Sequence, residues 1–72
     1  MWVNVFAEPI PTHGKHGEKF LLTLSYQIYY GHKTPEHSEV VIGVWNGVCE
    51  CFFEADTGKE IDERDIAYWW KE

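Results

Sequence analysis

The stretch Glu39–Glu54 reads Glu-Val-Val-Ile-Gly-Val-Trp-Asn-Gly-Val-Cys-Glu-Cys-Phe-Phe-Glu and predicts a β-hairpin. Asn46-Gly47 separates two runs rich in β-branched and aromatic residues, and this dipeptide favours the φ > 0 positions of a two-residue type I′ turn. Such a turn sets the register Trp45–Val48, Val44–Cys49, Ile42–Cys51 and Val40–Phe53. The rest of the fold prediction is built on this hairpin.

The hairpin has two faces, because successive side chains of a strand point to opposite sides. One face is wholly apolar and is expected to form the core: Val40, Ile42, Val44, Cys49, Cys51 and Phe53. The other is mixed and is expected to be partly open: Val41, Gly43, Trp45, Val48, Glu50 and Phe52. Cys49 and Cys51 are two residues apart on one strand and cannot readily bridge, because the Cα atoms of a disulfide must lie near each other, so both are predicted to be free buried thiols of a reducing compartment.

Three further segments predict strands. Trp2–Phe6 alternates before a proline-containing stop, and Phe20–Tyr30 keeps a period of two over its whole length. Asp65–Trp70 is compatible with a strand or a short helix, and its aromatic content favours the strand. The sequence therefore predicts one small, mainly β domain over residues 1–72, an antiparallel sheet or SH3-like open barrel of about four to five strands.

Length and charge limit the function. The chain has 72 residues and a net charge of −6, so it lacks the basic surface that direct binding to nucleic acid requires. No apolar run is long enough to span a membrane, and no signal peptide is recognised, so a cytoplasmic protein is expected. A chain this short has a marginal core, which self-association into a homo-oligomer would supplement.

Several short motifs together carry a resemblance to a known family. Trp2-Val3-Asn4-Val5, Gly17-Glu18-Lys19-Phe20-Leu21-Leu22, Val44-Trp45-Asn46-Gly47 and Asp65-Ile66-Ala67-Tyr68-Trp69 span most of the chain. They resemble small phage and prophage proteins that carry the domain of unknown function numbered 551. Where that family continues into Met-Pro-Leu-Pro, this sequence has Trp70-Lys71-Glu72, and residues 31–38 look like an insertion. The resemblance implies a small β fold and a phage or prophage protein acting in a host cell, and it transfers no catalytic residue.

A loop framed by glycines is the first candidate binding site. Glycine lets backbone N–H groups approach an anion, and lysine supplies positive charge. With nearby tryptophans as a stacking platform, the loop would hold a small phosphorylated nucleotide and so inhibit a host defence signal. The residues are His13, Gly14, Lys15, His16, Gly17, Lys19, Trp45 and Trp69. The alternative for the loop is an ordinary exposed connection, and for Trp2, Trp45 and Trp69 a place in the core.

An acidic segment supports a different function, contact with a host protein. Its carboxylates would mimic nucleic acid in the basic channel of a host effector. The residues are Glu54, Asp56, Glu60, Asp62 and Glu63. A structural accessory protein without a ligand is the remaining alternative.

Metal binding and catalysis are not expected. His13-x-x-His16 and His32–His37 loosely fit zinc-ligand spacing, whereas Cys49-x-Cys51 is too close for the usual zinc knuckle. Neither Ser25 nor Ser38 lies in a nucleophile elbow. We therefore expect a non-enzymatic binding protein with no cofactor.

Overall fold

A computed structural model describes all residues of the chain, 1–72. Six strands carry the fold: β1 (Trp2–Asn4), β2 (Lys19–Leu24), β3 (Val40–Asn46), β4 (Cys51–Glu54), β5 (Glu60–Ile61) and β6 (Ile66–Trp70). Three short helical turns connect them: η1 (Tyr26–Tyr30), η2 (Pro35–His37) and η3 (Glu63–Asp65). None of these helices has the length and apolarity that a membrane crossing requires.

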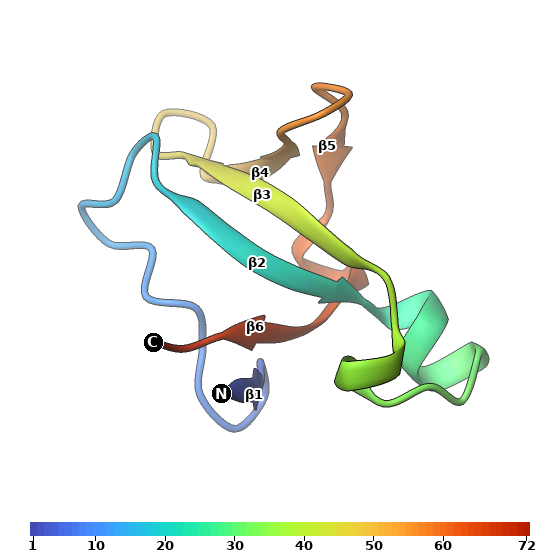
Figure 1. The fold of residues 1–72 in the computed structure, drawn as a ribbon. Helices are drawn as coiled ribbons and strands as arrows, with labels where there is room; N and C mark the ends of the chain where they lie inside the picture. Colours follow the sequence, from blue (N-terminus) through green and yellow to red (C-terminus); the bar gives the residue numbers. More distant parts are fainter.

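The strands form one open antiparallel sheet in the order β1-β6-β2-β3-β4-β5 (Figure 1). The last strand thus lies between β1 and β2, and the two chain ends lie near each other because Trp2 pairs with Trp70. The prediction of a small, mainly β domain is confirmed, although the sheet has six strands where about four to five were expected.

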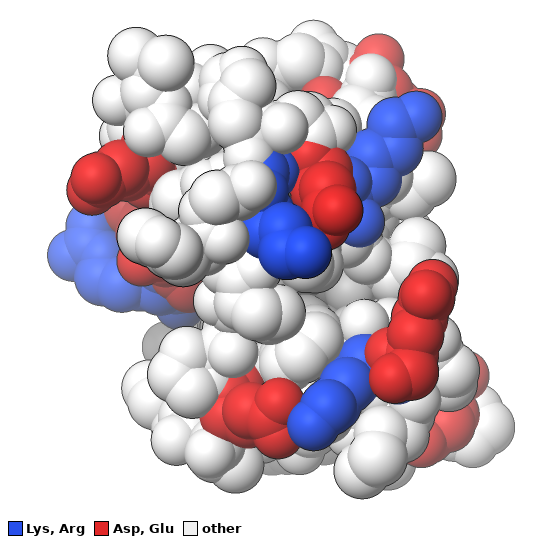
Figure 2. All heavy atoms as spheres, turned by 90° about the vertical axis from the view of Figure 1, so that its left-hand side faces the viewer, with Lys and Arg blue, Asp and Glu red and all other residues white.

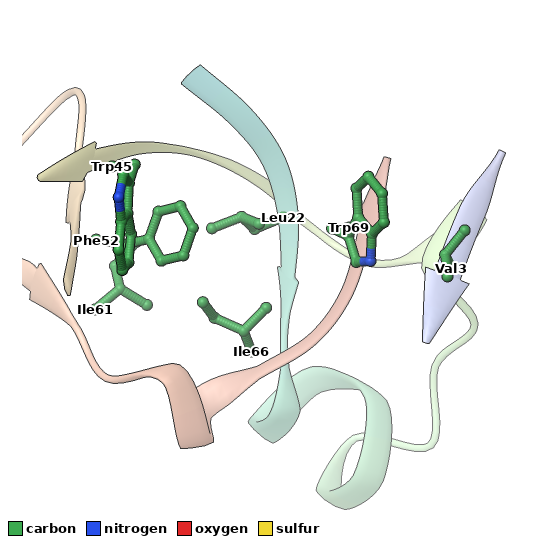
Figure 3. Close-up of a cluster of buried hydrophobic side chains, with 7 residues drawn as sticks. All are labelled: Val3, Leu22, Trp45, Phe52, Ile61, Ile66 and Trp69. Carbon is green, nitrogen blue, oxygen red and sulfur yellow. The ribbon is translucent and has the colours of Figure 1, made fainter. Parts of the chain in front are cut away.

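The sheet curls around its core. Seven buried apolar residues form a single cluster to which every strand contributes: Val3, Leu22, Trp45, Phe52, Ile61, Ile66 and Trp69. Figure 3 shows Leu22 and Ile66 between a Trp45–Phe52–Ile61 group and a Trp69–Val3 group. Strands from both edges of the sheet reach one cluster, so this concave side is the inner face.

The predicted core face of the hairpin was wrong. Trp45 is 7% exposed and Phe52 is fully buried, whereas Val40 and Ile42 are 44% and 40% exposed. Gly43 lies on the inner face, where an added Cβ would come within 2.5 Å of Leu22 Cδ1. The missing side chain at Gly43 therefore gives the larger Leu22 and Phe52 the room to fill the concave side.

The prediction that both thiols are buried is wrong for the same reason, because it depended on the predicted core face. Cys49 is exposed in the loop between β3 and β4, and Cys51 is half-buried on the outer face. Both thiols are free, as expected.

The hairpin turn is also longer than predicted. Asn46 pairs with Cys51 and Trp45 with Phe52, so four residues, 47–50, form the loop. Asn46 Oδ1 accepts hydrogen bonds from the N–H groups of Val48 and Cys49 at 2.9 and 3.0 Å. Glu50, with φ of 55°, takes the left-handed conformation that was assigned to Gly47. The Asn-Gly dipeptide thus marked the place of the turn correctly and its type incorrectly.

The long strand predicted for Phe20–Tyr30 ends at Leu24. The neighbouring strands explain this, since β3 begins at Val40, opposite Thr23, and β6 begins at Ile66, opposite Leu24. Beyond Leu24 no strand offers ladder partners, and the backbone instead forms the π-helical turn η1.

The ambiguous last segment is a strand, as its aromatic content favoured. Its register against β2 shifts, because Thr23 pairs with Tyr68 and Leu24 with Ile66. The extra residue, Ala67, makes a β-bulge, which lets Ile66 and Trp69 both face the core although they are three residues apart.

Candidate ligand-binding cleft

The segment between β1 and β2 is fastened to the end of β3. The N–H of Gly17 donates to the carbonyl of Trp45 at 2.8 Å, and the N–H of Trp45 donates to the carbonyl of Glu18 at 2.9 Å. The N–H of Gly47 donates to His16 Nδ1 at 2.8 Å. These bonds hold residues 16–18 against the hairpin, so the walls on either side have fixed positions.

A polar hollow of about 370 Å³ lies between this segment and the hairpin. Its lining residues are Thr12, His13, Gly14, Trp45, Gly47, Glu50 and Glu63. The indole N–H of Trp45 has no hydrogen-bond partner within the chain, whereas the N–H of Trp69 donates to the carbonyl of Glu8 at 2.8 Å. Figure 3 shows the indole nitrogen of Trp45 on the side of the ring away from Leu22.

An apolar hollow of about 320 Å³ adjoins it. Its lining residues are Val5, Phe6, Pro9, Ile10, Thr12, Glu63 and Ile66. Thr12 and Glu63 line both hollows, so the two are compartments of one cleft. A ligand that fills the cleft therefore meets apolar carbon in one compartment and carboxylates in the other.

The two carboxylates of the polar compartment are unneutralised. Neither Glu50 nor Glu63 takes part in any of the three ion pairs of the chain, which are Lys15–Glu18, Arg64–Asp62 and Lys71–Glu8. Glu50 is also one of two non-glycine residues with positive φ. Residues in this conformation cost free energy and often mark functional sites.

Three of the eight residues predicted to bind a nucleotide line the cleft: His13, Gly14 and Trp45. Trp69 does not, because it is buried in the core and hydrogen-bonded to Glu8. Trp45 and Trp69 are both core residues, so the expected platform of stacked tryptophans is absent.

The basic residues of the predicted loop also point elsewhere. Lys15 lies 3.8 Å from the carboxylate of Glu18, and Lys19 belongs to β2 on the outer face of the sheet. The N–H groups of Lys15, Gly17 and Glu18 are already used by the carbonyls of Thr12, Trp45 and Lys15. Figure 2 views the side that this segment occupies in Figure 1, and it shows acidic and basic side chains intermixed with no continuous basic patch.

The acidic residues predicted for protein contact do not form one surface. Glu63 lines the cleft, whereas Glu60 lies on the outer face and shares a separate hollow with Glu54. Asp56 is exposed in the turn after β4. Hydrogen bonds from the side chain and backbone of Arg64 lower the pKa of Asp62 to about 2.

The sequence reasoning missed several lining residues, among them Glu50 and Phe6. Glu50 was assigned to a strand, and only the four-residue loop brings it to the hollow that Glu63 also lines. Phe6 is 85% exposed at the apolar compartment, and its position after the Trp2–Asn4 strand was no signal by itself.

No three His, Cys, Asp or Glu side chains lie close enough together to hold a metal ion.

The comparisons with known proteins yield no relative. No family model, no curated protein and no solved structure matches the chain. The resemblance to the phage family therefore stays a prediction.

Proposed function

We propose that the chain is a non-catalytic binding domain whose cleft holds a segment of a partner protein, with an apolar side chain next to a Lys or Arg. The observation that carries this proposal is the composition of the cleft. Its apolar compartment borders Glu63, and its polar compartment adds Glu50. A peptide segment with an apolar side chain followed by a cation matches this arrangement, because its apolar side chain fits the apolar compartment and its cation faces the carboxylates.

Electrostatics supports a cationic ligand over an anionic one. Glu50 and Glu63 have no partner within the chain, and the whole chain carries a net charge of −6. A Lys or Arg bound between them would gain charge-assisted hydrogen bonds, each worth on the order of 1.5–3 kcal/mol. A phosphate placed there would meet like charge.

The biological setting follows from the resemblance to phage and prophage proteins. On that basis the partner is a host protein, and the proposed role is to inhibit host defence by occupying a basic surface of it. The acidic chain would also be attracted to such a surface over a distance, which raises the rate of association.

A phosphorylated nucleotide is the second candidate ligand. The unpaired indole N–H of Trp45 favours it, because a base edge offers acceptors for that donor. His13 and Gly14 line the same compartment, and their backbone N–H groups have no carbonyl partner in the chain.

Calorimetry with an array of short peptides tests the proposal. The array places each apolar residue before Lys, Arg or, as a matched control, Gln. We expect binding that requires the cation and that weakens at least about tenfold in Glu50→Gln/Glu63→Gln. The control variant Glu36→Gln/Glu72→Gln changes the net charge equally outside the cleft and should bind as the parent does.

The same assay includes a panel of linear and cyclic nucleotides. Binding of a nucleotide that is weakened in Trp45→Phe, which removes the indole N–H, and kept in Glu50→Gln/Glu63→Gln would establish the nucleotide function in place of the peptide function. Binding of neither class would leave the structural accessory role.

A further inference from the structure

The outer face of the sheet exposes contiguous apolar side chains. Leu21 on β2 pairs with Ile42 on β3, and each is 40% exposed. Val40, on the same face of β3, is 44% exposed. An apolar surface of several adjacent side chains on a small acidic chain commonly marks an interface.

A row of four paired residues crosses this face. From β2 to β5 the pairs run Lys19–Val44, Val44–Phe53 and Phe53–Glu60. Each of the four precedes or follows a residue that is buried in or packed against the core, so all four side chains lie on the outer face: the core neighbours are Phe20, Trp45, Phe52 and Ile61.

The row is electrostatically complementary to itself. It has a cation, Lys19, at one end, an anion, Glu60, at the other, and two apolar residues between them. Neither charged group forms an ion pair within the chain. Any two-fold rotation that reverses the row therefore brings opposite charges together twice.

We propose that this outer face binds the outer face of a second copy of the chain. The two-fold axis lies parallel to the strands, between β3 and β4. It places Lys19 of one copy over Glu60 of the other, and Val44 over Phe53 of the other. Two sheets packed face to face lie about 10 Å apart, so the side chains of the rows meet in the middle.

Curvature and charge both favour this arrangement over a contact elsewhere. The outer face is the convex side of a curled sheet, so Val44 and Phe53 on the strands nearest the axis make the closest contact, and the long side chains of Lys19 and Glu60 reach across the wider gap at the flanking strands. Copies with a net charge of −6 repel each other at long range, and the two Lys19–Glu60 pairs offset that repulsion locally. The cleft borders the concave side, so each copy keeps its cleft open in the dimer.

The proposal is tested by reversing the charges of the row. Sedimentation over a range of protein concentrations measures how strongly each variant dimerises. We expect the parent chain to dimerise, and to dimerise less at high salt, because exposed ion pairs are screened. Glu60→Lys and Lys19→Glu each place like charges together and should weaken dimerisation at least about tenfold. The double variant Lys19→Glu/Glu60→Lys should restore it.

Two further variants keep the test decisive. Glu36→Lys makes the same charge change as Glu60→Lys, but in η2 and outside the row, and should dimerise at least as well as the parent. Ile42→Asp places a charge in the apolar part of the face without touching the row, and should give a monomer with a parent-like circular dichroism spectrum. A parent chain that stays monomeric throughout, or a double variant as weak as the single ones, would overturn the proposal.

Discussion

The two faces of β3 are alike in sequence and opposite in structure. Val40, Ile42 and Val44 are all apolar, yet they lie on the outer face. Gly43 and Trp45, one of them without a side chain, are buried. A uniformly apolar strand face is therefore a poor guide to the core when the opposite face also carries large aromatic residues. The face that lines the inside of a curled sheet is the one that carries a few large side chains and a glycine that leaves room for them.

The strongest test of this difference compares two adjacent phenylalanines. Phe52 is fully buried, and truncation to Ala should cost about 3–5 kcal/mol in free energy of unfolding. Phe53→Ala removes the same atoms from the half-buried outer face and should cost no more than about 1.5 kcal/mol. Urea unfolding of both variants at one protein concentration measures the difference. Equal losses would mean that the faces are not distinct.

A smaller effect is expected from filling the gap at Gly43. In Gly43→Ala the new Cβ would lie 2.5 Å from Leu22 Cδ1 and 3.2 Å from Phe52 Cδ1, so the core must shift. Overpacking of this kind costs about 1–3 kcal/mol. Ile42→Val, next to it on the outer face, is the control and should change stability by less than about 1 kcal/mol. An unchanged urea midpoint for Gly43→Ala would show that the inner face tolerates a methyl group there.

The register that joins both faces depends on the loop of residues 47–50. Glu50→Gly removes a side chain from a left-handed conformation and should stabilise the fold by about 0.5–1 kcal/mol, after the greater entropy of glycine in the unfolded chain is counted. Gly47 does not have positive φ, and an added Cβ would lie 3.3 Å from His16 Cβ. Gly47→Ala should therefore be mildly destabilising. Thermal unfolding in which Glu50→Gly raises the melting temperature and Gly47→Ala lowers it would confirm the four-residue loop. The reverse effects of the two substitutions would favour the type I′ turn.

The smallest expected effect is kinetic and concerns the thiols. Cys51 on the outer face should react with an alkylating reagent in the native state, more slowly than the exposed Cys49. Desolvation, and then the negative charge of Glu60, raise the pKa of the Cys51 thiol, so less of it is the reactive thiolate at neutral pH. Its labelling rate should increase with pH and in Glu60→Gln. Protection of Cys51 until the protein unfolds would contradict its place on the outer face.

The sequence by itself determined the class of the fold and the places of its turns. Period-two alternation, β-branched and aromatic enrichment, and Asn46-Gly47 are local properties, and local backbone preferences act on them directly. The strand character of Ile66–Trp70 and much of β2 followed in the same way. The sequence also selected His13, Gly14 and Trp45 as candidate ligand-binding residues, and the structure places all three in one cleft.

Only the tertiary structure decided which face is the core, where β2 ends and what the cleft contains. Gly43 and Trp45 are buried because the sheet curls toward the face on which they lie, and curvature is a property of all six strands together. β2 stops at Leu24 because its neighbours supply no further partners. Glu50 and Glu63, 13 positions apart in the sequence, line the same hollow only because a loop length and a strand order bring them there, and neither can be deduced from the residues alone.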